Sequence, residues 1–210
     1  MTRRRSAYRS LRSLQRDNRV CRACAEVGFP LESLPVLHGH EGQRAYMLGQ
    51  APGAVEGEER RPWRGKAGHT LRRWLQMDEA EFYATFYCAS VTRCYPGRAP
   101  AGKGDRVPTP RERELCSFWR EWEFRLLRPV LVVPVGGLAI RQLLGRAALA
   151  DSIGQPFEHD GSTVIPLPHP SGVSIWLNDP ANRALVARAV ELIHDKLAAI
   201  RAGVEPYLGG

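Results

Sequence analysis

Short apolar runs alternate with amphipathic stretches along most of the chain. Four runs have the residue types of buried strands, at residues 45–48, 86–91, 129–135 and 163–167. They lack regular polar positions, which is typical of parallel strands covered on both faces. Helical patterns occupy residues 67–76, 111–127, 137–149 and 181–201. This order predicts an α/β fold, a three-layer α/β/α sandwich around a central four-stranded, mainly parallel sheet.

The length and composition indicate one domain. The chain has 210 residues and is 43% hydrophobic, enough for one full core. Residues 95–110 are rich in Pro, Gly and basic side chains, and we interpret them as a loop inside the domain. Residues 1–18 are expected to form a basic, helical N-terminal arm. We therefore predict a single domain over residues 1–210.

The charge balance indicates a polyanionic partner. Lys and Arg number 30 against 22 Asp and Glu, which gives a net charge of +8. Arginine binds phosphate oxygens well, so nucleic acid is a candidate partner. The alternative is that the arginine content reflects a GC-rich genome or a hot habitat. No apolar run of about 18 residues occurs and no apolar segment follows the basic N-terminus, so we expect no membrane association and a cytoplasmic location. We also expect a monomer, on which the sequence itself is silent.

The cysteines are candidate metal ligands. Cys21 and Cys24 form a C-x-x-C pair, Cys94 follows the second predicted strand, and Cys116 lies in the next predicted helix. Cys88 falls inside the strand and is expected to be a buried apolar residue. Four thiolates can hold zinc or an iron–sulfur cluster. The wide separation of Cys94 from Cys116 favours a cluster over zinc, and buried unliganded thiols are the remaining alternative.

Two loops follow predicted strands and contain residues suited to a binding site. Gly49-Gln50-Ala51-Pro52-Gly53 comes after the first strand, and His169-Pro170-Ser171 after the fourth. The carboxyl ends of parallel strands are where open α/β sheets bind ligands. A lone histidine is more often a surface or core residue, but two such loops at one edge favour a site.

Together these motifs resemble the uracil-DNA glycosylase superfamily, most closely its iron–sulfur families four and five. The resemblance runs from Cys21 to about Asn178. The stretch from Gly49 to Gly68 has the length of the family pattern G-E-A-P-G-x-x-E-D-x-x-G-x-P-F-V-G-x-A-G without a gap, and it agrees at Gly49, Ala51, Pro52, Gly53, Glu56, Pro62, Gly65, Ala67 and Gly68. It implies a [4Fe–4S] cluster on the four cysteines, damaged DNA as the partner, and excision of uracil or another deaminated base to leave an abasic site. The ligands it implies are Cys21, Cys24, Cys94 and Cys116.

The resemblance also implies roles for the loop residues. His169 would donate a hydrogen bond to the uracil O2, Gln50 would orient a water, and Glu56 is the nearest candidate general base. The base would be bound by Gly49, Ala51, Pro52, Gly53, Trp63 and Ser90. Trp63 replaces the family's stacking Phe, with burial in the core as the alternative, and Ser90 replaces an Asn that reads the base edge.

DNA contacts are expected from two further segments. Val173 takes the place of an intercalating leucine in the segment Ser171-Gly172-Val173. The loop between the cysteines offers Arg98, Lys103 and Arg106 to phosphates, with simple solvation as the alternative.

Two other functions stay open on the sequence. Gln50, Ser90 and the lack of a carboxylate in residues 49–53 are compatible with a glycosylase fold that is catalytically weak or inactive and binds nucleic acid without cutting it. A zinc-dependent nucleic-acid-binding protein of another fold is the second alternative.

Overall fold

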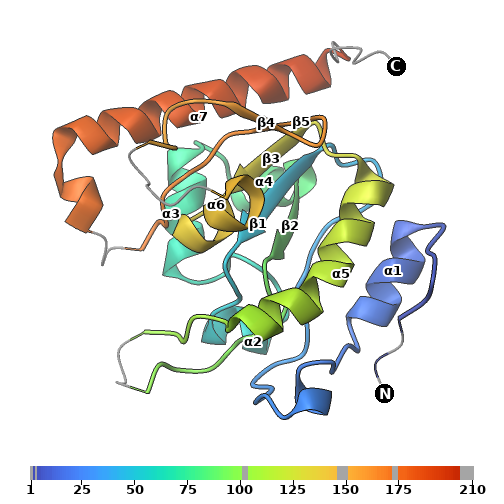
Figure 1. The fold of residues 1–210 in the computed structure, drawn as a ribbon. Coiled ribbons are helices and arrows are strands. Elements are labelled where there is room, and N and C mark those ends of the chain that lie inside the picture. The colour runs from blue at the N-terminus through green and yellow to red at the C-terminus, as the bar shows by residue number, and fades with distance from the viewer. Residues whose placement is uncertain (1, 3, 101–103, 146–150, 172–174, 204–210) are drawn as a thin grey trace.

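A five-stranded sheet forms the centre of the molecule (Figure 1). The computed structural model describes residues 2, 4–100, 104–145, 151–171 and 175–203. The strands are β1 (Ala45–Gly49), β2 (Phe86–Ser90), β3 (Leu131–Pro134), β4 (Phe157–His159) and β5 (Ser162–Val164). Their order is β2-β1-β3-β5-β4, and only β4 runs antiparallel, to β5. The predicted α/β class is confirmed, but the count of four strands is wrong.

The missed strand is short and polar. β4 has three residues and includes Glu158, so it gives no apolar run. It joins β5 through Asp160 and Gly161, whose φ angles are 48° and 75°. An Asp-Gly pair with two positive φ angles is the usual two-residue hairpin turn. That dipeptide was the sequence signal for β4.

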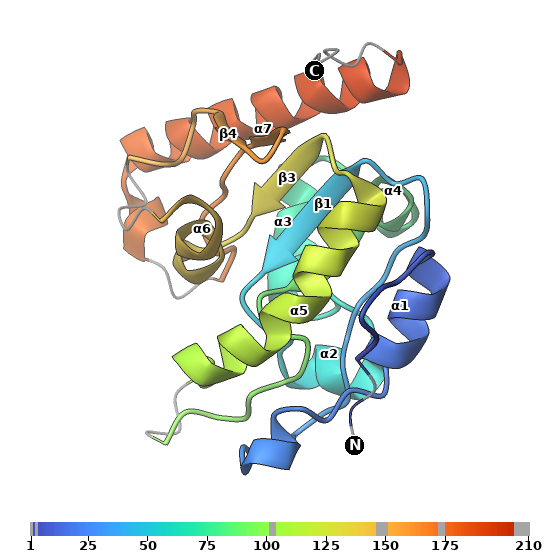
Figure 2. The same cartoon turned by 45° about the vertical axis from the view of Figure 1, so that its right-hand side comes forward.

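Helices cover both faces of the sheet, as Figures 1 and 2 show. They are α1 (Leu11–Asn18), α2 (Ala54–Glu59), α3 (Lys66–Trp74), α4 (Glu79–Thr85), α5 (Pro110–Leu127), α6 (Gly137–Leu144) and α7 (Pro180–Arg201). All four predicted helices are present. The one expected over 137–149 ends at Leu144, where Gly145 adopts a left-handed φ of 65°. The helix of the N-terminal arm is confined to α1.

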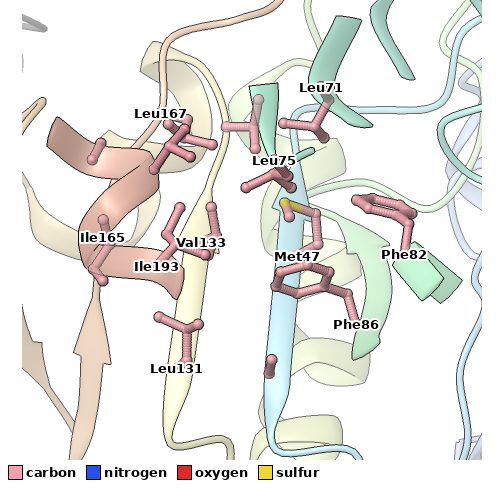
Figure 3. Close-up of a cluster of buried hydrophobic side chains, with 14 of the residues drawn as sticks. Met47, Leu71, Leu75, Phe82, Phe86, Leu131, Val133, Ile165, Leu167 and Ile193 are labelled. Atoms are coloured by element: carbon pink, nitrogen blue, oxygen red, sulfur yellow. The ribbon is translucent and has the colours of Figure 1, made fainter. Parts of the chain in front are cut away.

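Side chains of each central strand point alternately to two cores. Met47 of β1 packs with α3, α4 and α7, whereas Tyr46 and Leu48 pack with α1 and α5. Figure 3 shows the first of these cores, where Leu71 of α3, Leu75 directly after α3 and Phe82 of α4 lie around Met47. This two-sided burial explains why the strands are apolar throughout.

The second core contains a buried charged network. Glu123 of α5 is fully buried and accepts hydrogen bonds from Arg93 and from the hydroxyls of Tyr46 and Tyr87. A buried charge is tolerated only when it is paired and hydrogen-bonded. The network therefore fixes Arg93, which follows β2, against α5.

Both edges of the sheet are protected. His38 forms an antiparallel bridge to Cys88, with N···O distances of 2.9 and 2.7 Å, on the side of β2 that faces away from β1. At the opposite edge lies the three-residue β4. None of the helices in the described part of the chain is long and apolar enough to cross a membrane.

Candidate functional site

A pocket of about 300 Å³ opens at the carboxyl ends of the parallel strands. Gly49, at the end of β1, pairs with Ser90, at the end of β2. The next segment along this edge is placed by a parallel bridge between Val135 and Leu167, two residues before His169. The loops after β1 and β5 therefore meet, as the sequence predicted.

Every residue proposed from the sequence for catalysis or base binding lines this one pocket. They are Gly49, Gln50, Ala51, Pro52, Gly53, Glu56, Trp63, Ser90 and His169. The pocket also contains Asp105 and Lys66, which the sequence analysis did not propose.

Gly49 keeps the floor of the pocket open. A Cβ atom at this position would lie 3.1 Å from the Ser90 Oγ and 3.1 Å from Cζ2 of Trp63. A larger residue would therefore fill the space between these two side chains. The glycine is needed for a cavity, not for a turn.

Trp63 belongs both to the pocket and to the core. It is 8% exposed and contacts the core beneath α3, yet its ring edge lines the cavity. Its backbone has a φ of 61°, which is rare outside glycine, and its carbonyl accepts a 2.8 Å hydrogen bond from Arg72. Trp63 therefore packs in the core and also borders the pocket.

His169 lies at the rim, where its side chain is exposed to solvent. A Cβ atom at Gly136 would lie 3.3 Å from the His169 Cβ, and Gly136 has a φ of 87°. The surrounding protein still removes enough water to lower the pKa of His169, against the opposing effects of Asp105 and Glu56. The imidazole is therefore neutral at pH 7 and keeps one N–H donor.

Glu56 links the loop after β1 to the segment that precedes α3. Its carboxylate accepts hydrogen bonds from the backbone N–H of Gly53, at 3.1 Å, and of Gly65, at 2.7 Å. The first contact caps α2 and the second reaches the start of α3. Each carboxylate oxygen therefore has a structural partner.

The four predicted cysteine ligands line a second, small cavity. Cys21, Cys24, Cys94 and Cys116 all border it, and Cys88 does not. The indole N–H of Trp119 donates to Cys21 Sγ, and the backbone N–H of Arg93 donates to Cys116 Sγ, both at 3.3 Å. Such donors favour sulfur that carries negative charge.

The surroundings of the thiols disfavour their free thiolates. Burial raises the pKa of Cys24 to about 12, with further contributions from Cys116, Glu112 and Cys21. Burial and the other cysteines also raise the pKa of Cys94. Among the described residues, no group of three or more His, Cys, Asp or Glu could hold a single metal ion. The four thiols surround a common space without the close grouping that one ion requires.

A family model for the uracil DNA glycosylase superfamily matches residues 38–201 of the chain. The chain belongs to this superfamily. The match includes the whole sheet, the pocket and His169, as well as Cys94 and Cys116. The two N-terminal cysteines, Cys21 and Cys24, precede it.

Individual glycosylases are similar over most of their length. A type-5 uracil-DNA glycosylase of Thermus thermophilus is 32% identical over 168 residues, 72% of each chain. A type-4 uracil-DNA glycosylase of Thermotoga maritima is 26% identical over 154 residues, 72% of this chain and 76% of that protein. The resemblance to families four and five is thus confirmed.

The expected DNA-contacting residues differ in their surroundings. Arg98 is exposed, and Ser171 is half-buried beside His169. Arg106 instead forms a two-pronged ion pair with Glu112, with both N···O distances 2.8 Å, and this pair ties the loop to α5. Lys103, Gly172 and Val173 lie outside the described residues.

Asp105 is the acidic pocket residue that the sequence analysis missed. It is the one acidic residue between Cys94 and Pro110, in a loop that was interpreted as a phosphate-binding surface. A lone carboxylate in a basic loop was the signal available. Only the fold brings it across to the loop after β1.

Proposed function

We propose that this superfamily member hydrolyses the N-glycosidic bond of uracil, or of another deaminated base, in DNA and leaves an abasic site. The observation that carries the proposal is the gathering of the Gly49–Gly53 loop, Trp63, Ser90 and His169 around one pocket. Relatives named type-4 and type-5 uracil-DNA glycosylases support the same reaction. The net charge of +8 supports a DNA partner.

The pocket suits a base that has left the helix. A base inside a duplex is unreachable, so the enzyme flips it out or acts on single strands. Trp63 would contact the base through its ring edge, beside the space that Gly49 leaves open. Ser90 offers one hydroxyl to the base edge, at the end of β2. A hydroxyl can rotate to act as a donor or as an acceptor, so it discriminates less strictly than an amide, whose donor and acceptor are fixed on separate atoms.

His169 supplies the donor for the departing base. Cleavage leaves the bonding electron pair on the base and positive charge on the sugar, as in other glycoside hydrolysis. A preorganised N–H donor at the base O2 stabilises that negative charge. Because the pKa of His169 is lowered, the ring is neutral, and a neutral imidazole offers one N–H donor. Gln50, which cannot accept a proton, would orient the attacking water.

We further propose that Cys21, Cys24, Cys94 and Cys116, which border the second cavity, hold an iron–sulfur cluster. The support is the donor set, which consists of four thiols around one space and two N–H···S contacts. A cluster is wider than a single ion, which agrees with the absence of a one-ion site among the described residues. When bound, such a group supplies a rigid link between distant segments. These residues would then join the N-terminal arm, the end of β2 and α5.

Excision from a labelled oligonucleotide tests the proposal. Wild-type protein should convert uracil to an abasic site in single-stranded DNA or opposite G. The His169→Ala variant should be slower by about 10²–10³, the usual cost of losing one such donor. The iron and sulfide content of both proteins should be equal, because His169 does not line the cysteine cavity. Full activity in the variant would remove His169 from this role.

Binding without cutting is the second candidate, and one observation favours it. The loop after β1 has no carboxylate within residues 49–53, and Glu56 is already held by two amides. Folded, iron-loaded protein that retains DNA but releases no deaminated base would support this alternative. Stoichiometric zinc in place of iron and sulfide would contradict the cluster.

A further inference from the structure

The pocket contains a second carboxylate, Asp105, that neither loop motif includes. It comes from the segment between the cysteines and lines the same cavity as His169 and Gly53. A Cβ atom at Gly53 would lie 3.3 Å from Oδ2 of Asp105, so this oxygen lies against the loop after β1. Asp105 and His169 line the same pocket, and the charge of Asp105 opposes the lowering of the His169 pKa.

The position of Asp105 is fixed by its own segment. Its backbone bridges to Arg98, and the N–H of Arg106 bonds to the Gly97 carbonyl at 2.8 Å. The Tyr95 hydroxyl is also hydrogen-bonded to Asp105. Asp105 is therefore held from its own loop, with its carboxylate presented to the pocket.

Glu56 and Asp105 differ in what occupies their oxygens. Glu56 binds the N–H groups of Gly53 and Gly65 through separate oxygens. Asp105 is exposed at the pocket and caps no helix. Of the two carboxylates in the described pocket, Asp105 is the one available to a reacting sugar or water.

We propose that Asp105 is the catalytic carboxylate of this pocket. This inference rests on the proposed glycosylase function and names the residue that completes it. The bond between C1′ and the base nitrogen breaks, and its electron pair leaves with the base. A water oxygen forms the new bond to C1′, and the water proton passes to Asp105 and then to solvent. Before that transfer, the negative carboxylate stabilises the positive charge on the sugar.

The first test compares Asp105→Asn with Glu58→Gln in single-turnover excision of uracil. Both variants remove one negative charge, and Glu58 is an exposed α2 residue outside the pocket. We expect Asp105→Asn to lower the rate about 10²-fold, as for loss of a general base, and Glu58→Gln to match wild type. Asparagine can still bond to Tyr95, so the loop should keep its shape, which circular dichroism and thermal unfolding would check.

The second test does not need turnover. Wild-type protein should bind an oligonucleotide carrying a cationic pyrrolidine abasic analogue about tenfold more tightly than one carrying neutral tetrahydrofuran. Asp105→Asn should bind the two equally, because an amide has no charge to attract the cation. A structural role for Asp105 would weaken both complexes and leave their ratio unchanged.

The outcomes separate the two proposals. If wild type excises uracil while Asp105→Asn keeps its rate within twofold, the assignment of Asp105 is wrong and the glycosylase function stands. A slower variant that retains the preference for the cationic analogue would also overturn the assignment, because the loss would then arise from loop position. If wild type cuts no base, the proposed function fails. In that case, a preference of wild type for the cationic analogue that is lost in Asp105→Asn would still place the carboxylate at the sugar. If wild type binds the two analogues equally, the assignment of Asp105 is refuted.

Discussion

The roles of several side chains at this site cannot be predicted from their neighbours in the sequence. Glu56 lies close to the glycine-rich loop in sequence and was an obvious candidate base, but its oxygens hold two amides. Arg106 was a candidate for phosphate binding, but it pairs with Glu112. Glu56 lines the pocket, whereas Arg106 ties its loop to α5. Their partners depend on loop geometry, which no spacing rule predicts.

Histidine titration gives a prediction at the level of one residue. The pKa of His38 is lowered, mainly by burial and further by Arg61 and Arg19. The unfolded chain, with a histidine pKa of about 6.5, therefore binds more protons than the folded chain just below that pH. The stability from neutral His38 is complete above about pH 6.5 and is lost as the pH falls through the lowered value.

Urea unfolding at pH 7.5 and 5.5 measures this effect. We expect the free energy of unfolding to fall on acidification more steeply in wild type than in His38→Gln, at equal cofactor content. His40, a second histidine near His38, stays in both proteins. An identical pH dependence in the two proteins would mean that His38 is not an acid-sensitive group.

At the level of elements, apolar runs and helix caps were sufficient for most of the fold. The strands β1, β2 and β3 were found because they are buried on both faces, and β5 because it lies in the apolar run over residues 163–167, although its Thr163 is only partly buried. Helix α5 was found from Pro110 and its acidic first turn, and Thr109 and Glu112 form a reciprocal cap there. The short helices α2 and α4 and the polar β4 were missed. Elements of this length are set by tertiary contacts more than by periodicity.

The start of α3 gives a prediction that opposes helix propensity. Replacing a helical glycine with alanine usually stabilises a helix by up to about 1 kcal/mol. At Gly68, however, a Cβ atom would lie 1.8 Å from the carbonyl oxygen of Trp63. We expect Gly68→Ala to destabilise the protein by about 1–3 kcal/mol, because the backbone beside Trp63 must shift.

Thermal or urea unfolding checks this expectation against a matched control. Gly137 begins α6, and its added Cβ would meet only the flexible end of Arg141, at 3.3 Å. Gly137→Ala should be neutral or slightly stabilising. Equal free energies of unfolding in the two variants would show that the contact between Gly68 and Trp63 does not affect stability.

Across the whole molecule, the cysteine cavity joins segments that are far apart in sequence. Cys21 follows α1, Cys94 follows β2, and Cys116 lies in α5. The sequence predicted these four thiols as a set, because the resemblance supplied a pattern that spacing alone did not. A group bound only by the folded state stabilises that state.

Two serine substitutions test this link. Cys116→Ser should lose the brown colour and bound iron and should lower the melting temperature, because one of four ligands is removed. Cys88→Ser replaces a buried cysteine outside the cavity and should keep full iron content, although it too loses some stability. Iron analysis and melting curves of both variants give the comparison. Equal iron in Cys116→Ser and wild type would exclude Cys116 as a ligand.

The bridge between His38 and Cys88 has a consequence for crowded solutions. An uncovered outer strand offers free amides and carbonyls on which another chain can build. Here the backbone of His38 occupies both groups of Cys88 in the middle of β2, and β4 is too short to template a partner strand. Folded copies can therefore be concentrated without seeding shared β-sheets between molecules.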